Sequence, residues 1–399
     1  MRLRLPPSAL DRAAWALLCL FVFSVPWEKS VWVHGIGTIS RLLGIVAFAA
    51  GAVVAFRRRA IRPPNIALVL AGIFVLWSAL TYGWSLDRPA TRVRVVTLVE
   101  LFAMLWLVWD SCRRPLRQRR LIEAYVLGAV TGSCVAFVRY IHDLQTYYRR
   151  YAAPGFDPND FGLVLALSIP LSLYLALSGR GRMRWCWRAA TLIVISAVLL
   201  TASRTALIAT FIAFSFALWT WRKADFSQRV SSVLLAALLA LGLLRFAPAP
   251  SRQRLATIPS EISRGTFHGR AEIWKSGVRA WKSHPVLGVG SGAYPEAVRP
   301  WLGRPDVPGI QYVAHNTFLS VLVECGVIGF GLYALLLGVL FLFVWMMPSP
   351  ERALWAVMLA VWAAGVSTLT WEHYKPTWLM FALIMTEWAR SWWPTGKGE

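Results

Sequence analysis

The chain has 399 residues, of which 57% are hydrophobic and only 15% are charged. A soluble domain carries about 25% charged residues, so this composition excludes an ordinary water-soluble enzyme and favours a membrane protein with many spans. The net charge of +23 does not indicate nucleic-acid binding, because most Lys and Arg residues lie in short loops between apolar segments, where they set topology.

Twelve apolar segments follow one another along the chain. They are residues 13–27, 36–56, 66–84, 94–111, 121–140, 160–178, 189–203, 205–221, 230–247, 316–346, 353–370 and 377–393. Spans of about 20 residues cross a bilayer, so the sequence predicts an all-α, polytopic membrane protein with about twelve transmembrane helices. The first segment resembles a signal peptide, but no small-residue cleavage site follows it, and we expect it to be retained.

The Lys and Arg residues of the short loops differ between the two sides of the membrane. Four alternate loops hold sixteen of these residues, whereas the first four loops of the opposite side hold six. Because basic loops stay in the cytoplasm, we expect both termini to be cytoplasmic and the opposite loops to face outward.

One outer loop, residues 248–315, is much longer than the others. It divides the chain into helices one to nine (1–247), the loop itself and helices ten to twelve (316–399). Nine Lys and Arg residues against four acids indicate an anionic ligand there, with attraction to lipid phosphates as the alternative. Within the loop, 270–283 is predicted to form an amphipathic helix with Ile273, Trp274 and Trp281 on its apolar face, lying along the membrane interface.

Three ionisable residues at the outer face are candidates for chemistry, because such groups are costly near the membrane. Arg204 lies at the turn between helices seven and eight, where it either binds a ligand or caps the hairpin. Arg270 begins the amphipathic helix, where backbone amides favour anions. His315 lies between the basic loop and helix ten, where it either caps that helix or accepts a proton from a hydroxyl.

Further polar residues are candidates for substrate binding. The loop 141–159 offers Arg149, Arg150 and Asn159 for a sugar, although it is also compatible with an ordinary interfacial loop. The remaining candidates are Lys275, Asn316 and Glu372. Two acids inside helices, Glu100 and Glu324, are instead expected to pair with Arg41 or Arg139.

The sequence offers no sign of a metal or a nucleotide cofactor. It has no phosphate-binding Gly-rich loop, no paired acids of the Asp-x-Asp kind in an outer loop, and five scattered cysteines without metal-ligand spacing. If the anionic ligand is a phosphate, arginines must neutralise its charge.

Four stretches of the chain resemble the bacterial O-antigen ligase family, which is related to O-antigen polymerases and protein-glycosylating oligosaccharyltransferases. Their order and spacing around one large outer loop carry the resemblance, which covers residues 155–330. They are residues 157–162 (DPNDFG), 201–206 (TASRTA), 269–274 with 284–290 (GRAEIW, HPVLGVG), and 315–319 with 324–329 (HNTFL, ECGVIG).

The resemblance implies a GT-C-like glycosyltransferase of the bacterial inner membrane. Such an enzyme transfers a glycan from undecaprenyl pyrophosphate to a lipid A-core sugar at the periplasmic face, with inversion and without a metal. The family's two arginines match Arg204 and Arg270, and its histidine matches His315. His315 would then be the general base, and the arginines would hold the pyrophosphate. The partners implied are the lipid-linked glycan, the lipid A-core acceptor and membrane lipids.

Two alternatives compete with a ligase. An O-antigen polymerase uses the same donor but extends a growing glycan, and such enzymes tend to have two substantial outer loops. A flippase or transporter would instead be expected to have charged or broken helices near the membrane midplane, whereas the chemistry-capable residues here gather at the outer face.

Overall fold

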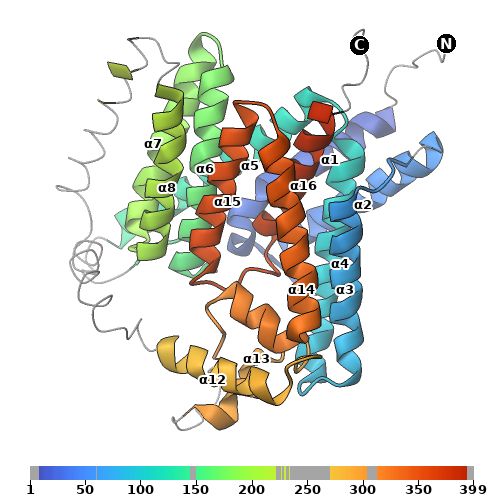
Figure 1. Ribbon diagram of the computed structural model, residues 1–399. Coiled ribbons are helices and arrows are strands. Elements are labelled where there is room, and N and C mark those ends of the chain that lie inside the picture. The colour runs from blue at the N-terminus through green and yellow to red at the C-terminus, as the bar shows by residue number, and fades with distance from the viewer. Residues whose placement is uncertain are drawn as a thin grey trace.

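The computed structural model describes residues 9–59, 61–143, 150–221, 226, 229–230, 233, 270–302 and 312–392. Nearly all of the regular structure there is helical (Figure 1). The long helices are α1 (Ala9–Ser24), α2 (Ile39–Arg58), α3 (Ile66–Leu80), α4 (Arg88–Ser111), α5 (Pro115–His142), α6 (Pro158–Ser178), α7 (Arg182–Leu200), α8 (Arg204–Trp221), α12 (Arg270–Ser283), α14 (Thr317–Met346), α15 (Glu351–Val366) and α16 (Lys375–Trp392).

Short elements connect several of these helices. They are the 3₁₀ helices η1 (Val25–Ser30), η2 (Thr81–Gly83) and η4 (Arg299–Trp301), the helix α13 (Tyr294–Val298), and the antiparallel pair β1 (Trp32–Val33) and β2 (Gly37–Thr38). Within the described ranges, seven helices are long and apolar enough to cross a membrane. The fold is therefore that of an all-α, multi-pass membrane protein, as the sequence predicts.

The described helices coincide with eleven of the twelve expected apolar segments; the remaining one, 230–247, lies almost wholly outside the described residues. The long apolar block 189–221 is indeed divided, because α7 ends at Leu200 and α8 begins at Arg204. Much of the outer loop, residues 248–269 and 303–311, is likewise outside the described residues.

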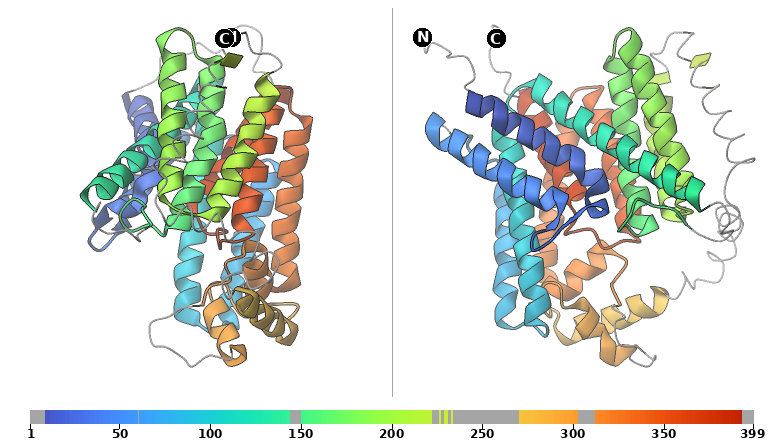
Figure 2. Two further views of the ribbon diagram at one scale, coloured as in Figure 1. Left: turned by 90° about the vertical axis from the view of Figure 1, so that its left-hand side faces the viewer. Right: turned by 180° about the vertical axis from the view of Figure 1, so that it is seen from behind.

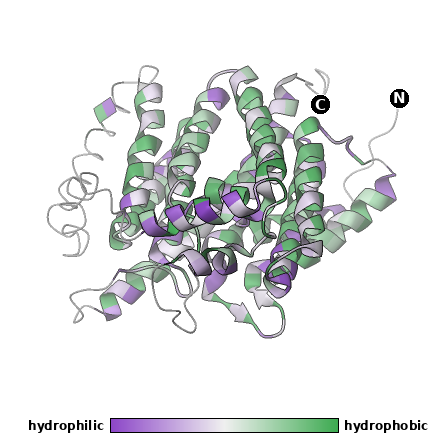
Figure 3. Ribbon diagram, turned by 60° about the horizontal axis from the view of Figure 1, so that its bottom comes forward, coloured by the Kyte–Doolittle hydropathy of each residue, from purple (hydrophilic) through white to green (hydrophobic). Residues whose placement is uncertain are grey.

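The helices pack in three groups. Helices α1 and α2 lie side by side and cross obliquely next to α5, as Figure 2 shows from behind. Helices α6, α7, α8 and α15 form the second group, and α3, α4, α14 and α16 form the third. The short helices α12 and α13 cover one end of the third group, opposite the start of α1 and the end of α16 (Figure 1). The long helices are hydrophobic over most of their length (Figure 3).

Helix α14 is broken at Gly326, and the segment that follows α12 docks into the break. The amide of Gly290 donates to the carbonyl of Glu324 (2.9 Å), and the amide of Val327 donates to the carbonyl of Pro285 (2.9 Å). Gly326 has φ of +65° and Gly288 has φ of +74°, which favour glycine. The segments 284–290 and 324–329 are therefore one backbone-to-backbone joint, which fixes α12 against α14.

Candidate active site

Arg204 is placed by the tight turn between α7 and α8. Ala202 has a left-handed backbone with φ of +49°, and the Ser203 hydroxyl accepts a hydrogen bond from the amide of Ala206 (3.3 Å). Arg204 is the first residue of α8. It therefore stands at a helix N-terminus, where the free backbone amides favour an anion.

The segment before α6 packs against the same turn. Arg150 donates from Nε to the carbonyl of Thr201 (2.9 Å) and from Nη2 to Oδ1 of Asn159 (2.7 Å). Asp157 caps α6 by accepting from the amide of Asn159 (2.7 Å). Arg150 and Asn159 thus bind each other and hold this segment at the Arg204 turn. Arg149 lies outside the described residues.

Asp160 ties α6 to the turn before α16. Its carboxylate accepts hydrogen bonds from Nε1 of Trp371 (2.9 Å) and the hydroxyl of Tyr374 (2.8 Å), and Nζ of Lys29 lies 3.7 Å away. Gly162 follows one half-turn later, where a Cβ would come within 2.6 Å of the Ala206 side chain. The 157–162 motif therefore brings α6, α8 and the 371–374 turn together.

Arg270 begins α12, and Trp274 anchors that helix beside His315. The indole Nε1 of Trp274 donates to the carbonyl of Ala314 (2.8 Å), the residue directly before His315. Because Trp274 lies one turn after Arg270 on the same helix, this bond fixes the arginine and the histidine on neighbouring segments.

The packing of α12 differs from the expectation of a helix with its Trp face in the membrane interface. Its fully buried residues are Ser276, Gly277 and Ala280, and a Cβ at Gly277 would come within 2.4 Å of the Tyr294 hydroxyl. Small residues let α12 approach α13 and α14 closely, so the helix packs on protein. Lys275 is exposed on the other side.

His315 lies just before α14 rather than within it. Its φ of +46° is left-handed, a conformation that costs a non-glycine residue about 1 kcal/mol or more and is concentrated at functional sites. The helix is capped instead by Asn316, whose Oδ1 accepts from the amide of Leu319 (3.0 Å) and whose Nδ2 donates to the carbonyl of Ser367 (3.2 Å).

Burial and neighbouring charges shift the pKa values of His315 and Arg270. Burial lowers the pKa of His315, and the positive charge of Arg270 lowers it further. Burial also lowers the pKa of Arg270; Asp157 opposes this shift, and the neighbouring Arg204 adds to it. An imidazole with a lowered pKa is neutral at pH 7 and can accept a proton, while two adjacent guanidiniums attract an anion.

Glu372 lies in a buried ionic network. Its carboxylate is ion-paired with Arg94, whose guanidinium also lies 3.5 Å from Glu324, and Nδ1 of His373 is 3.1 Å away. Burial alone would raise the pKa of Glu372, but His373 and Arg94 outweigh it and hold this pKa well below its usual range. Glu372 is only 3% exposed.

The interior acids pair partly as the sequence predicts. Arg41 binds Glu100 (2.6 Å), which confirms that expectation. Glu324 pairs with Arg94 instead of Arg41 or Arg139, and Arg139 donates to the carbonyl of Ala152. Sequence reasoning missed Arg94, although an arginine among the apolar residues of a predicted span is itself a signal.

The site as a whole combines the ends of three segments. The start of α8 supplies Arg204, the start of α12 supplies Arg270, and the residue before the α14 cap supplies His315. Paired cations next to a neutral base can hold a phosphate leaving group while a hydroxyl loses its proton.

Comparison with known proteins finds a family match in this part of the chain. Residues 189–334 match the family model described as O-antigen ligase. This region of the chain is therefore similar to an O-antigen ligase domain. All three segments of the site lie within this domain, as does the joint between the 284–290 segment and the broken α14.

Two curated relatives agree with this assignment. A general O-oligosaccharyltransferase of Acinetobacter baylyi is 25% identical over 309 residues, which is 72% of this chain and 54% of the relative. The exopolysaccharide production protein ExoQ of Rhizobium meliloti is 36% identical over 77 residues, 18% of each chain. The chain thus spans about half the length of the first relative and under a fifth of the second.

Proposed function

We propose that this protein is an O-antigen ligase, a glycosyltransferase of the bacterial inner membrane. It transfers a glycan from undecaprenyl pyrophosphate to a hydroxyl of the lipid A-core at the periplasmic face. The observation that carries the proposal is the juxtaposition of Arg204, Arg270 and His315, three residues from distant parts of an O-antigen ligase domain.

The reaction proceeds by inversion at the anomeric carbon. The acceptor hydroxyl oxygen attacks this carbon, His315 takes the hydroxyl proton, and the bond from the carbon to the pyrophosphate oxygen breaks. Arg204 and Arg270 stabilise the negative charge that grows on the leaving oxygen. Arginine supplies this stabilisation without a metal because its planar guanidinium contacts phosphate oxygens in pairs.

The remaining candidates surround this centre. Lys275 is exposed on α12 and adds positive charge near the donor, whereas Asn316 supports His315 by capping α14. Arg150 and Asn159 hold the segment before α6 against the turn that carries Arg204. Glu372 holds the 371–374 turn in place through its ion pair with Arg94. In the proposed reaction these five residues bind substrate or hold the groups that do.

The test is transfer by the purified protein from a lipid-linked glycan to each of three acceptors. We expect transfer to lipid A-core, little to a second lipid-linked glycan or a peptide, and full activity in EDTA. Extension of the lipid-linked glycan alone would make the protein a polymerase, and glycosylation of the peptide alone would make it an oligosaccharyltransferase. Loss of activity in EDTA with recovery in Mg²⁺ would overturn the arginine-only mechanism.

A further inference from the structure

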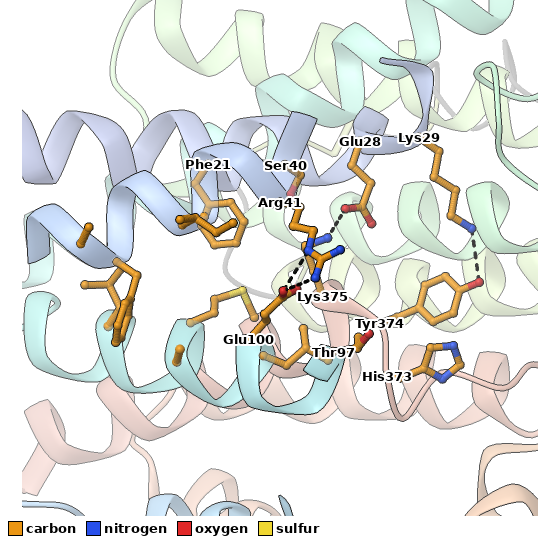
Figure 4. Close-up of a pocket in the computed structure, with 18 residues that line it drawn as sticks. Phe21, Glu28, Lys29, Ser40, Arg41, Thr97, Glu100, His373, Tyr374 and Lys375 are labelled. Atoms are coloured by element: carbon orange, nitrogen blue, oxygen red, sulfur yellow. Dashed lines mark hydrogen bonds and ion pairs between the residues drawn. The ribbon is translucent and has the colours of Figure 1, made fainter. Parts of the chain in front are cut away.

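A cavity of about 440 Å³ lies between α1, α2 and α4 (Figure 4), and neither Arg204 nor Arg270 lines it. Its walls are mainly apolar and include Phe21, Ile45, Phe48, Leu101 and Met104. Ile45 is 51% exposed and Phe48 is 38% exposed on the outer surface of the helices. An apolar cavity whose wall reaches the lipid-facing surface suits a hydrocarbon chain that enters sideways from the bilayer.

One end of this cavity is polar, and two ion pairs lie there. Arg41 pairs with Glu100 (2.6 Å), and Lys375 pairs with Glu28. Lys29 lies 3.3 Å from the Tyr374 hydroxyl, as Figure 4 shows. Such an end offers both donors and acceptors to hydroxyl and phosphate groups, which suits the head of a glycolipid.

The polar end is linked to the proposed base through Asp160. Tyr374, which lines the cavity, donates to Asp160, and Asp160 also accepts a hydrogen bond from Nε1 of Trp371 (2.9 Å). The amide of Trp371 in turn donates to Oγ1 of Thr317 (2.7 Å), two residues after His315. The segment that carries His315 is thus connected to the polar end of the cavity through the 371–374 turn, whereas Arg270 acts on His315 from outside the cavity lining.

We propose that this cavity binds an acyl chain of the acceptor lipid. The inference rests on the proposed function, in which His315 takes a proton from the acceptor while the arginines hold the donor pyrophosphate. A base in that position lies between its two substrates, so the site reached through Asp160 belongs to the acceptor. The bound chain anchors the acceptor lipid so that its sugar hydroxyl reaches His315.

The experiment fills the cavity and leaves the proposed active site intact. Ala103→Phe places a ring in the α4 wall, and Ala49→Phe does so from α2 in case the first variant fails to fold. Val53→Phe is the matched control, because Val53 is 47% exposed on α2 and does not line the cavity. KM is measured for the donor, for lipid A-core and for the same core saccharide without acyl chains.

We expect the filled variants to raise KM for lipid A-core by roughly tenfold or more, since each methylene removed from apolar contact costs about fourfold in binding. KM for the donor and for the deacylated saccharide should stay unchanged, and Val53→Phe should resemble wild type. An unchanged KM for lipid A-core would overturn the proposal. A raised KM for the donor would also overturn it, because the cavity would then hold the donor chain.

Binding measured by native mass spectrometry separates this inference from the proposed function. Wild type should retain lipid A-core, and Ala103→Phe should lose it while retaining polyprenyl pyrophosphate. Selective loss of phosphatidylglycerol instead would assign the cavity to an ordinary membrane lipid and overturn the proposal. If wild type binds lipid A-core in the cavity but transfers nothing to it, the proposed function fails and the binding site stands.

Discussion

At the scale of single residues, two of the turns that form the proposed site contain a residue with an unusual backbone conformation. Ala202 and His315 both have left-handed φ values, +49° and +46°. One precedes Arg204 by two residues, and the other is the proposed base. The side chains of Ser203 and Asn316 accept hydrogen bonds from backbone amides next to these turns, and such contacts offset part of the local backbone cost.

The different roles of His315 and Arg270 predict different defects. His315→Ala should lower the single-turnover transfer rate by about 10²–10⁴, the usual contribution of a general base, while donor binding is retained. Arg270→Ala should lose both rate and donor affinity, and Arg270→Lys should recover only part, because an ammonium lacks the paired guanidinium contact. The measurements are donor binding and transfer, normalised to folded protein. If His315→Ala transferred glycan at nearly the wild-type rate, His315 would not be the general base.

The lowered pKa of His315 predicts the pH dependence of transfer. Only the neutral imidazole accepts a proton, so the rate should fall as pH decreases through the pKa of His315. Burial and Arg270 lower that pKa, so the half-maximal rate should lie below about pH 6.5, the unperturbed value for histidine. A rate profile between pH 4.5 and 8 tests this. A midpoint above pH 7 would contradict it, provided that the protein stays folded across the range.

At the scale of elements, α12 and α14 act as one unit. The 284–290 segment runs into the break of α14, with backbone hydrogen bonds on both sides of Gly326. A Cβ at Gly288 would lie 2.4 Å from the backbone oxygen of Glu324. Because the obstacle is backbone and not a flexible side chain, the joint tolerates only glycine there.

This joint predicts a contrast between two glycine substitutions. Gly288→Ala should destabilise the protein by about 1–3 kcal/mol or more, through the left-handed backbone and the clash with Glu324. Gly331→Ala is the matched control within α14, because no atom lies within 4 Å of its added Cβ, and it should be neutral or slightly stabilising. Thermal unfolding in detergent measures both. Equal melting temperatures for the two variants would show that the joint does not hold α12 in place.

At the scale of the whole molecule, helix α12 lies at the opposite end of the helices from the start of α1 and the end of α16 (Figure 1). Basic loops between the helices favour the side where α1 starts as cytoplasmic. With that orientation, we expect the proposed active site to lie at the periplasmic face, where a lipid-linked glycan and lipid A-core would meet.

Cysteine labelling in spheroplasts tests this orientation. Lys282→Cys, exposed on α12, should react with an impermeant maleimide in intact spheroplasts, whereas Arg180→Cys, exposed between α6 and α7, should react only after lysis. The background replaces the exposed cysteines Cys134 and Cys186 with serine. The reverse pattern would invert the topology and place the site in the cytoplasm.

The amino-acid sequence was enough to predict the membrane class and the described helices, and it indicated the residues of the proposed site. Apolar segments of about 20 residues can satisfy their backbone only as helices in a membrane, so composition and length were enough for the element order. Arg204, Arg270 and His315 were recognisable because charged groups at predicted helix ends near the membrane need a reason to be there.

Only the tertiary structure decided which of these groups are neighbours. Arg94 and Glu372 are 278 positions apart and form a buried ion pair, and Gly288 meets Glu324 only because α14 breaks at Gly326. Helix α12 approaches Tyr294 and Leu319 closely at Gly277, a contact that its own hydrophobic pattern does not predict. Such contacts depend on how helices approach one another, which periodicity along a single helix does not encode.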